Sequence, residues 1–300
     1  MRSVPIVSLL LLACLAVDGQ EGKPLFRTLR VGMKIRYKST MRTTTEAKGD
    51  FKKSGGERTK GKEKTLEIYE RGWTETVLGI KSGQGHLAER KYEVSTKGTA
   101  KAASMPSKPD SVERTGINGK LVYLLRGPGS VGLGVKSGTL EGEEESELKF
   151  LEHLYVLIPE EAVKTGQSWE PDGAKVAKAL YEGLWDDTNF KVRAKCTYKG
   201  NDKVAGRACA RIQVAFQSDV AQFGEIPEIH TEYTGTILVA TDSGVILGYD
   251  LTGPLTMKGR SKDATSQTDW LIEGTRTMSL RGEVLEEGTE LEGGTMEVPQ

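Results

Sequence analysis

The chain has 300 residues, 37% of them hydrophobic, and is therefore long enough to bury one large core or two ordinary ones. Its 42 Lys and Arg residues are balanced by 42 Asp and Glu residues, so no net field attracts nucleic acid or an anionic membrane surface. Aromatic residues make up only 6%, which also argues against a surface on which nucleic-acid bases stack.

The N-terminus has the pattern of a secretory signal peptide. Arg2 precedes an apolar run over residues 4–17, and Gly19 follows as a small residue suited to cleavage. The run is too short for a convincing transmembrane helix. The sequence therefore predicts a signal peptide over residues 1–19 and a protein that is exported to the periplasm or the extracellular space.

Cys14 leaves a second outcome open for the N-terminus. It ends the segment Leu11-Leu12-Ala13-Cys14, which resembles a bacterial lipoprotein box whose cysteine is lipidated. Leu12 suits such a box poorly and Cys14 comes early, so simple removal of the segment is the competing expectation. In the lipidated case the protein would reach the membrane through this anchor alone.

Alternating apolar and polar residues predict strands through the first half of the chain. Residues 29–37 alternate in this way, and residues 65–80 and 87–96 return to the pattern. Residues 121–125 are short and apolar, as in a buried strand. Residues 48–64 are polar and rich in Gly, Lys and Glu, and they predict a mobile hairpin tip.

Two segments predict loops. Residues 97–110 are rich in Ala, Ser, Pro and Lys. Residues 127–132 match G-x-G-x-x-G directly after a predicted strand, but a dinucleotide site needs a helix that begins there. Glycines continue instead to Gly142 without an apolar helical period, so we expect a flexible loop and no cofactor.

Helical segments are few. Residues 147–158 are apolar enough for a short helix or a strand, and residues 174–184 predict one amphipathic helix. Over a concave sheet, Val176, Leu180 and Leu184 of this helix would form a lid on an apolar ligand. The alternative that the helix only fills the core is equally open.

The second half of the chain carries two cysteines, Cys196 and Cys209. They lie on predicted strands over residues 190–198 and 207–216, joined by turn residues 200–203. Pairing about that turn places the cysteines opposite each other, which predicts a disulfide in an exported protein. Two reduced core thiols are the alternative. No His or further Cys stands at zinc-ligand spacing around them.

The strongest hairpin signal lies in residues 235–251, where two apolar runs flank Asp242-Ser243-Gly244. Strands are also predicted over residues 230–241 and 270–280. Residues 283–300 contain Gly, Glu and Thr with little apolar content, so they predict a disordered acidic tail.

These elements predict a mainly β fold. We expect one large antiparallel, curved sheet, similar to a half-barrel, with one or two short helices, over residues 20–282. A turn glycine precedes a strand at Gly32 and again at Gly166. This faint echo is compatible with two similar strand sets, over residues 25–158 and 159–282.

A group of residues near the middle of the chain carries a family resemblance. These residues are Pro159, Val163, Gly166, Ser168 and Trp169. Their pattern resembles the P…V…G-D-S-W turn of an uncharacterised family of exported, β-rich bacterial proteins, many of them lipoproteins. Gln167 replaces the acidic residue, while segments 206–212 and 235–244 follow in the expected order. The resemblance implies an extended antiparallel sheet, distantly similar to lipoprotein-carrier half-barrels, and no catalytic residues.

Catalytic patterns are weak. His86, His153 and His230 have no metal-ligand spacing, so no metal site is predicted. Ser243 lacks the G-x-S-x-G elbow of a hydrolase, and a hairpin turn explains it. The adjacent carboxylates at 160–161 and 186–187 point apart on a strand and do not converge on one substrate.

We therefore expect a non-enzymatic protein of the cell envelope that binds a lipid or another apolar ligand in a concave sheet. A structural or protein-interaction module of the envelope is the alternative, with an envelope protein as its partner. A hydrolase whose site is not visible in the sequence is a second alternative. A pocket lined by Leu and Val would favour the first function, and a filled core with exposed strand edges would favour the second.

Overall fold

The computed structural model describes most of the chain after the N-terminal segment. The described residues are 25, 28–52, 58–81, 85–127, 130–136, 139, 142–159, 161–180, 190–221, 228–262 and 267–288. The predicted signal peptide and Cys14 lie outside them. No helix within these ranges is long and apolar enough to cross a membrane.

The described residues form one 12-stranded antiparallel sheet with short helices. The strands are β1 (Lys34–Lys52), β2 (Arg58–Lys81), β3 (Gly85–Ala102), β4 (Ser111–Arg114), β5 (Leu121–Gly127), β6 (Ser130–Val135), β7 (Ser168–Trp169), β8 (Phe190–Val204), β9 (Arg207–Val220), β10 (Glu228–Ala240), β11 (Ile246–Lys262) and β12 (Gln267–Glu286). The helices are α1 (Gly142–His153), the 3₁₀ helix η1 (Leu154–Leu157) and α2 (Gly173–Leu180). This confirms the predicted fold class.

The sheet is assembled from two meanders. Its strand order is β6-β5-β3-β2-β1-β12-β11-β10-β9-β8-β7, with β4 paired to the side of β3. The meanders meet where β1 pairs with β12, from Lys34 opposite Glu286 to Gly49 opposite Trp270. The predicted boundary between two halves, at residues 158–159, falls in the segment between η1 and β7.

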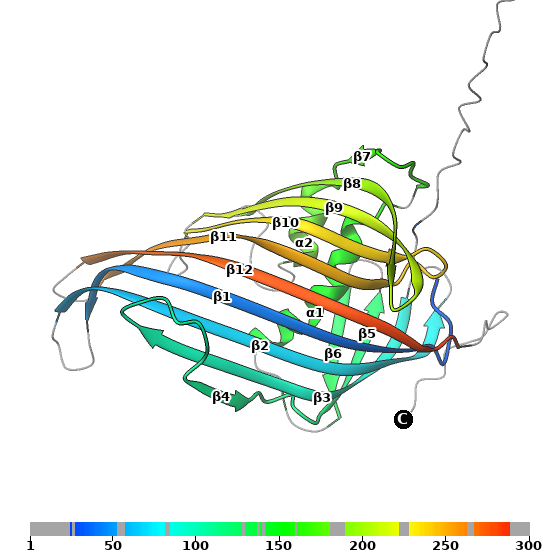
Figure 1. Cartoon of the computed structure of the whole chain (residues 1–300), viewed down its shortest axis with the longest axis horizontal. Helices are drawn as coiled ribbons and strands as arrows, with labels where there is room; N and C mark the ends of the chain where they lie inside the picture. The colour runs from blue at the N-terminus through cyan, green and yellow to red at the C-terminus, as the bar shows by residue number, and fades with distance from the viewer. Residues whose placement is uncertain are drawn as a thin grey trace, which may run out of the picture.

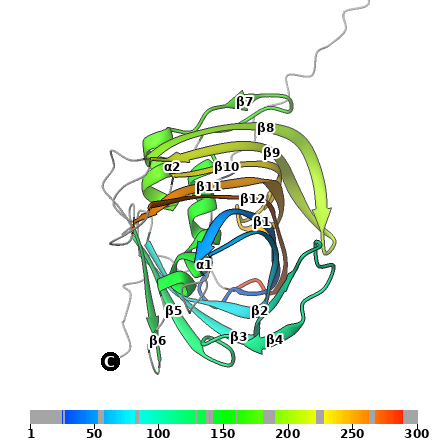
Figure 2. The ribbon, with the colours of Figure 1, turned by 90° about the vertical axis from the view of Figure 1, so that its left-hand side faces the viewer.

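The sheet curves around the helices without closing. In Figure 1 the long strands lie in front of α1 and α2, and Figure 2 shows the strands curving around the two helices. One hydrophobic core contains residues of both meanders together with residues of α1, η1 and α2. The core therefore lies on the concave face, between sheet and helices.

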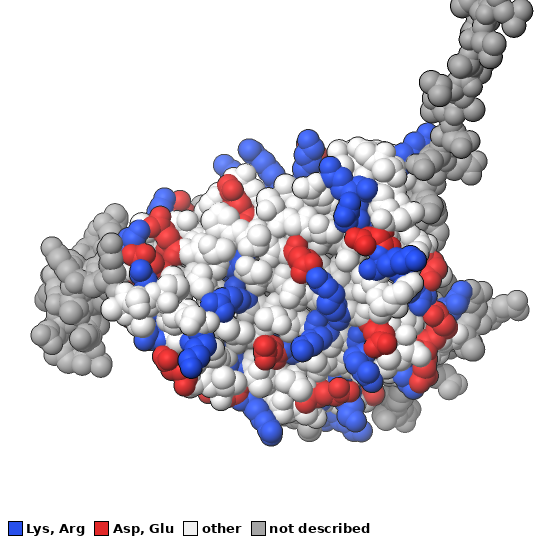
Figure 3. All heavy atoms as spheres, in the orientation of Figure 1, with Lys and Arg blue, Asp and Glu red and all other residues white. Residues whose placement is uncertain are grey.

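Strand β8 shows how the sequence builds this face. Its buried residues Val192, Ala194, Cys196 and Tyr198 alternate with exposed or half-buried ones such as Lys195. This period of two is what a strand with one buried face requires. The outer face of the sheet carries the exposed polar and charged side chains. Figure 3 shows Lys and Arg interspersed on this face with Asp and Glu.

The predicted hairpin around Asp242-Ser243-Gly244 is confirmed. It joins β10 to β11, and the Gly244 amide donates a hydrogen bond to the Ala240 carbonyl at 2.8 Å. Gly244 has a φ of 63°, in the left-handed region that glycine adopts without steric cost.

Several polar and glycine-rich segments that were predicted to be loops belong to paired strands. Residues 48–52 and 58–64 extend β1 and β2, with Lys52 opposite Arg58, so the predicted hairpin tip is much shorter. Residues 127 and 130–132 lie in a β5–β6 hairpin, so the expectation of a loop was wrong. Main-chain hydrogen bonds hold paired strands together, and polar side chains do not prevent these bonds at the ends of the strands.

Two further expectations need correction. The predicted loop over residues 97–110 begins later, because β3 continues to Ala102. The prediction of disorder from residue 283 onward was wrong for residues 283–286, which belong to β12, and Glu286 pairs with Lys34 of β1. Glu287 accepts two hydrogen bonds from Arg207, at 2.7 and 3.0 Å. Residues 289–300 lie outside the described residues.

The hairpin that carries the two cysteines turns at another place than predicted. Ala205 and Gly206 join β8 to β9, and their φ angles of 48° and 81° are the left-handed pair of a two-residue hairpin turn. Residues 200–203, the predicted turn, remain in β8, where the register shifts between Tyr198 and Asn201.

This register contradicts the predicted disulfide. Cys196 lies opposite Val214, and Cys209 lies opposite Asp202. Because Cys196 faces Val214, the two cysteines are displaced by the distance from Val214 to Cys209 along β9, which is about 16 Å at about 3.3 Å per residue. Bridged cysteines have Cα atoms within about 7 Å of each other. Both cysteines are free and buried. Burial raises the pKa of Cys196 to about 12 and that of Cys209 to about 11, so both are neutral core thiols.

Candidate apolar ligand site

A cavity of about 410 Å³ lies between the concave face of the sheet and the helices. Its walls come from β1 to β3 and β9 to β12 on one side, and from α1, η1 and α2 on the other. Most lining residues are apolar or aromatic. The aromatic ones are Trp73, Tyr92, Phe150, Phe216, Tyr233 and Tyr249. The volume falls within the roughly 300–1,000 Å³ that is common for small-molecule sites.

Helices α1 and η1 form the larger part of the helical wall. Leu148, Leu151 and Leu154 recur every third residue and line the cavity together with Leu157. This spacing places them along one side of the helical segment. The sequence analysis left residues 147–158 between helix and strand, although this leucine spacing is a signal that favours a helix.

The helical wall is fixed to the sheet by hydrogen bonds. The Ile246 amide donates to the Tyr155 hydroxyl at 2.9 Å, and the Trp169 indole donates to the Leu157 carbonyl at 3.0 Å. These bonds connect η1 to the start of β11 and to β7. The wall opposite the sheet is therefore held in a defined position.

The three residues predicted to form a lid differ in where the structure places them. Val176 on α2 is fully buried and lines the cavity. Leu180 ends α2, but its side chain is not described, and Leu184 lies outside the described residues. Asp172 caps the helix, because its carboxylate accepts a hydrogen bond from the Ala174 amide at 2.9 Å. The structure thus brings one of the three residues to the cavity and leaves the lid prediction untested for the other two.

A buried ionic network joins α1 to the sheet beside the cavity. The Arg90 guanidinium donates to Glu75 at 2.7 Å, to Glu152 at 2.9 Å and to the Leu148 carbonyl at 2.8 Å. Arg126 donates to the other oxygen of Glu152 at 3.0 Å. Burial opposes the charge of Arg90, but the facing carboxylates, Glu75 above all, hold its pKa above the ordinary value.

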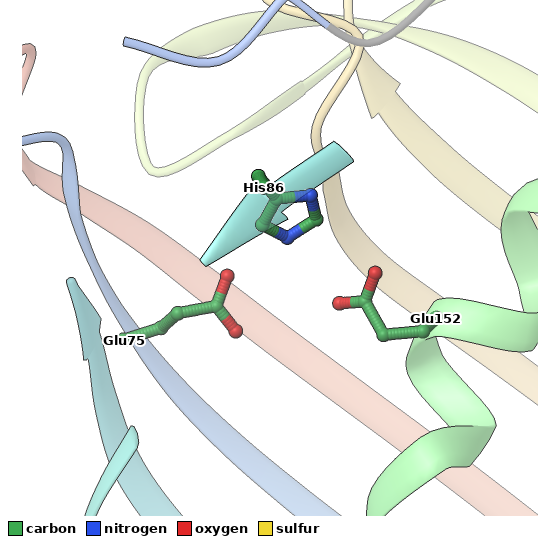
Figure 4. A group of neighbouring side chains, drawn as sticks. All are labelled: Glu75, His86 and Glu152. Carbon is green, nitrogen blue, oxygen red and sulfur yellow. The ribbon is translucent and has the colours of Figure 1, made fainter. Parts of the chain in front are cut away.

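Glu75, His86 and Glu152 are also near enough to one another to be considered as metal ligands. Figure 4 shows them pointing toward one another from β2, β3 and α1. One possible ligand atom of each lies within 4.8 Å of those of the other two. Arg90 and Arg126, however, already supply two positive charges to the two carboxylates. A metal ion would have to displace these guanidinium groups. We therefore interpret the group as a structural ion network.

The other two histidines have separate environments. His153 on α1 lines the cavity, and burial lowers its pKa to about 4, so it is neutral at pH 7. His230 lies on β10, where Asp219 at 2.5 Å and Glu232 at 3.2 Å surround its ring nitrogens. The hydrogen bond to Asp219 is the main cause that raises the pKa of His230.

The solved structures reported next resemble the chain only distantly, each with a TM-score below 0.5 and at most 10% identity. No protein-family model and no curated protein sequence matches the chain. Lipovitellin, in a structure on lipid–protein interactions, matches with a TM-score of 0.44 and 10% identity, over 89% of this chain and 26% of its own. The chain thus corresponds to about a quarter of that protein.

Two smaller proteins match over nearly their whole length. A β-barrel-like protein of unknown function from Brucella abortus has a TM-score of 0.20 and 8% identity, over 86% of this chain and 100% of its own. An outer membrane channel from Pseudomonas putida F1 has a TM-score of 0.23 and 8% identity, over 85% and 97%. Such scores place the chain in no family, and the resemblance at residues 159–169 stays a prediction.

Proposed function

We propose that this protein is an exported, non-enzymatic protein that holds a lipid or another apolar ligand in the cavity between its curved sheet and its helices. The cavity itself carries this proposal. Apolar and aromatic side chains form most of its lining, and transfer of an acyl chain from water into such surroundings is favourable by about 0.8 kcal/mol per buried methylene.

The fixed helical wall supports a site that exists before the ligand arrives. The bonds from Ile246 to Tyr155 and from Trp169 to Leu157 hold η1 in place. A preformed site loses less conformational entropy on binding than one that must be ordered by its ligand. Export to the periplasm or the extracellular space rests on the signal-peptide pattern of residues 1–19.

Native mass spectrometry tests the proposal directly. The purified protein is incubated with a mixture of fatty acids and phospholipids, and we expect an adduct of lipid mass that leaves on denaturation. Val214→Trp fills the cavity from β9 and should reduce the adduct at least fivefold. Val112→Trp, at a side chain that is 64% exposed on β4, is the matched control and should bind normally. Absence of any adduct from the folded wild-type protein would count against the proposal.

One observation favours the protein-interaction alternative. Large apolar side chains are exposed on neighbouring strands of the first meander, at Val94 on β3, Val112 on β4 and Leu125 on β5. Exposed apolar groups of this kind are common at protein contacts. Chemical cross-linking in the envelope of the host, compared between wild type and Val112→Lys, distinguishes this function, because the cavity is unaffected by that substitution.

A further inference from the structure

The charged side chains that line the cavity are all of one sign. No Asp or Glu lines it, whereas Arg71, Arg90 and Arg276 do. Glu75 and Glu152 neutralise Arg90. Arg276 has no such match: it donates to the Thr43 hydroxyl at 3.1 Å, and no carboxylate of the described residues pairs with it. A half-buried guanidinium without an anion attracts one.

Arg276 also faces a second hydroxyl. It projects from β12 beside Gly253 on β11, which has no side chain, and it interacts with Tyr233 on β10. Burial raises the pKa of Tyr233, and the guanidinium of Arg276 opposes that rise. Tyr233 is itself held by Phe216, whose ring stacks on it with centroids 6.2 Å apart. Arg276 and Tyr233 thus meet in the lining of the cavity, while the Thr43 hydroxyl, which is not part of that lining, accepts the Nε–H of Arg276.

The apolar part of the cavity begins next to this group. Along β12 the next inward residue is Met278, which lies opposite Met41 on β1 and Leu251 on β11. All three line the cavity, and beyond them lie Trp73 and the leucines of α1 and η1. The lining next to Arg276 is therefore apolar at Met278, Met41 and Leu251, as the chain of an amphiphile requires. The other two arginines of the lining, Arg71 and Arg90, lie further along the cavity.

We propose that Arg276, held at its Nε by Thr43 and accompanied by the hydroxyl group of Tyr233, binds the anionic head group of a single-chain amphiphile whose acyl chain lies in the apolar part of the cavity. This inference rests on the proposed function and specifies its ligand class. The two terminal nitrogens of the planar guanidinium offer parallel donors to a carboxylate or a phosphate, and the Tyr233 hydroxyl adds a further donor. A fatty acid and a lysophospholipid share this chemistry.

Binding of oleate and of oleyl alcohol by the full-length protein tests the inference. Calorimetry should show that wild type binds oleate at least tenfold more tightly than the alcohol. Arg276→Gln should remove this preference and leave the affinity for the alcohol unchanged, while Arg276→Lys should retain part of it. Arg281→Gln is the matched control, because Arg281 lies on the same strand with its side chain 53% exposed and paired with Asp250. This control should bind like wild type.

The outcomes separate this inference from the proposed function. Equal binding of oleate and alcohol by wild type, or an oleate affinity unchanged in Arg276→Gln, overturns the inference and leaves the cavity as an apolar site. Binding of neither ligand overturns both. Oleoyl lysophosphatidate, titrated in parallel, distinguishes the head groups: tighter binding than oleate, lost in Arg276→Gln, assigns a phosphate, and weaker binding assigns a carboxylate.

Discussion

Glu152 offers the sharpest test of how the helical wall is held over the cavity. Both of its carboxylate oxygens are bonded, one to Arg90 at 2.9 Å and one to Arg126 at 3.0 Å, and its side chain is fully buried. Glu152→Gln keeps the shape of the side chain and removes its charge. Arg90 then retains Glu75 as its only carboxylate partner among the described residues.

The expected loss follows from the burial of the network. Removing one partner of a buried ion pair costs about 3–5 kcal/mol, because a charge is left uncompensated in a low dielectric. Since Glu75 still faces Arg90 at 2.7 Å, we expect the lower end of this range, about 3 kcal/mol, in the free energy of unfolding. Urea unfolding followed by tryptophan fluorescence measures this loss.

The control is an exposed ion pair of the same sheet. Glu286→Gln breaks the pair with Lys34, whose side chains are 57% and 39% exposed, and should cost about 0–1 kcal/mol. Hydrogen exchange gives a second readout, because the amides of α1 should lose protection first in Glu152→Gln. If the loss for Glu152→Gln were below about 1 kcal/mol and equal to the control, the network would not hold α1, and the reasoning would be refuted.

Three further predictions use other parts of the core. The pKa of His153 is about 4 in the folded protein and near 6.5 when unfolded, so the unfolded state takes up more protons between these values. The free energy of unfolding should therefore fall by about 3 kcal/mol as the pH drops from 7 to 4. In His153→Gln this part of a pH-dependent denaturation curve should be flatter. Cys196 and Cys209 should react with iodoacetamide in denaturant without prior reduction but not in the folded protein, and detection of a native disulfide by mass spectrometry would contradict the register of β8 and β9. Gly253→Ala should lower the melting temperature strongly, because a Cβ there would overlap the main chain of β10, whereas Gly134→Ala meets nothing within 4 Å and should melt like wild type.

The sequence analysis predicted the features of the fold that depend on near neighbours in the chain. The alternation of Met33, Ile35 and Tyr37 with charged residues predicted a half-buried strand, and these three side chains are buried where β1 begins. The turn at Asp242-Ser243-Gly244 was found for a similar reason, because a tight turn depends on the backbone preference of a few residues.

The pairing register between strands was harder to predict from the sequence. Two glycine-containing turns, at residues 200–203 and at 205–206, compete in the same hairpin, and local preference favours neither decisively. The structure uses the second, and the cysteines therefore do not meet. The length of β1 and β2 was missed for a related reason, since polar strand ends are held by main-chain pairing that composition does not reveal.

The candidate site depends on contacts that the sequence alone did not determine. Arg276 reaches the cavity next to Thr43 because β12 pairs with β1, far apart in the chain. The sequence analysis did not identify Glu75, Arg90 or Glu152, because only the packing of α1 against β2 and β3 buries them as partners. Local sequence thus determined the strands, the main turns and an apolar face. The tertiary structure decided that Arg90 is paired with buried carboxylates and that Arg276 reaches the cavity, because burial and pairing arise only when distant segments meet.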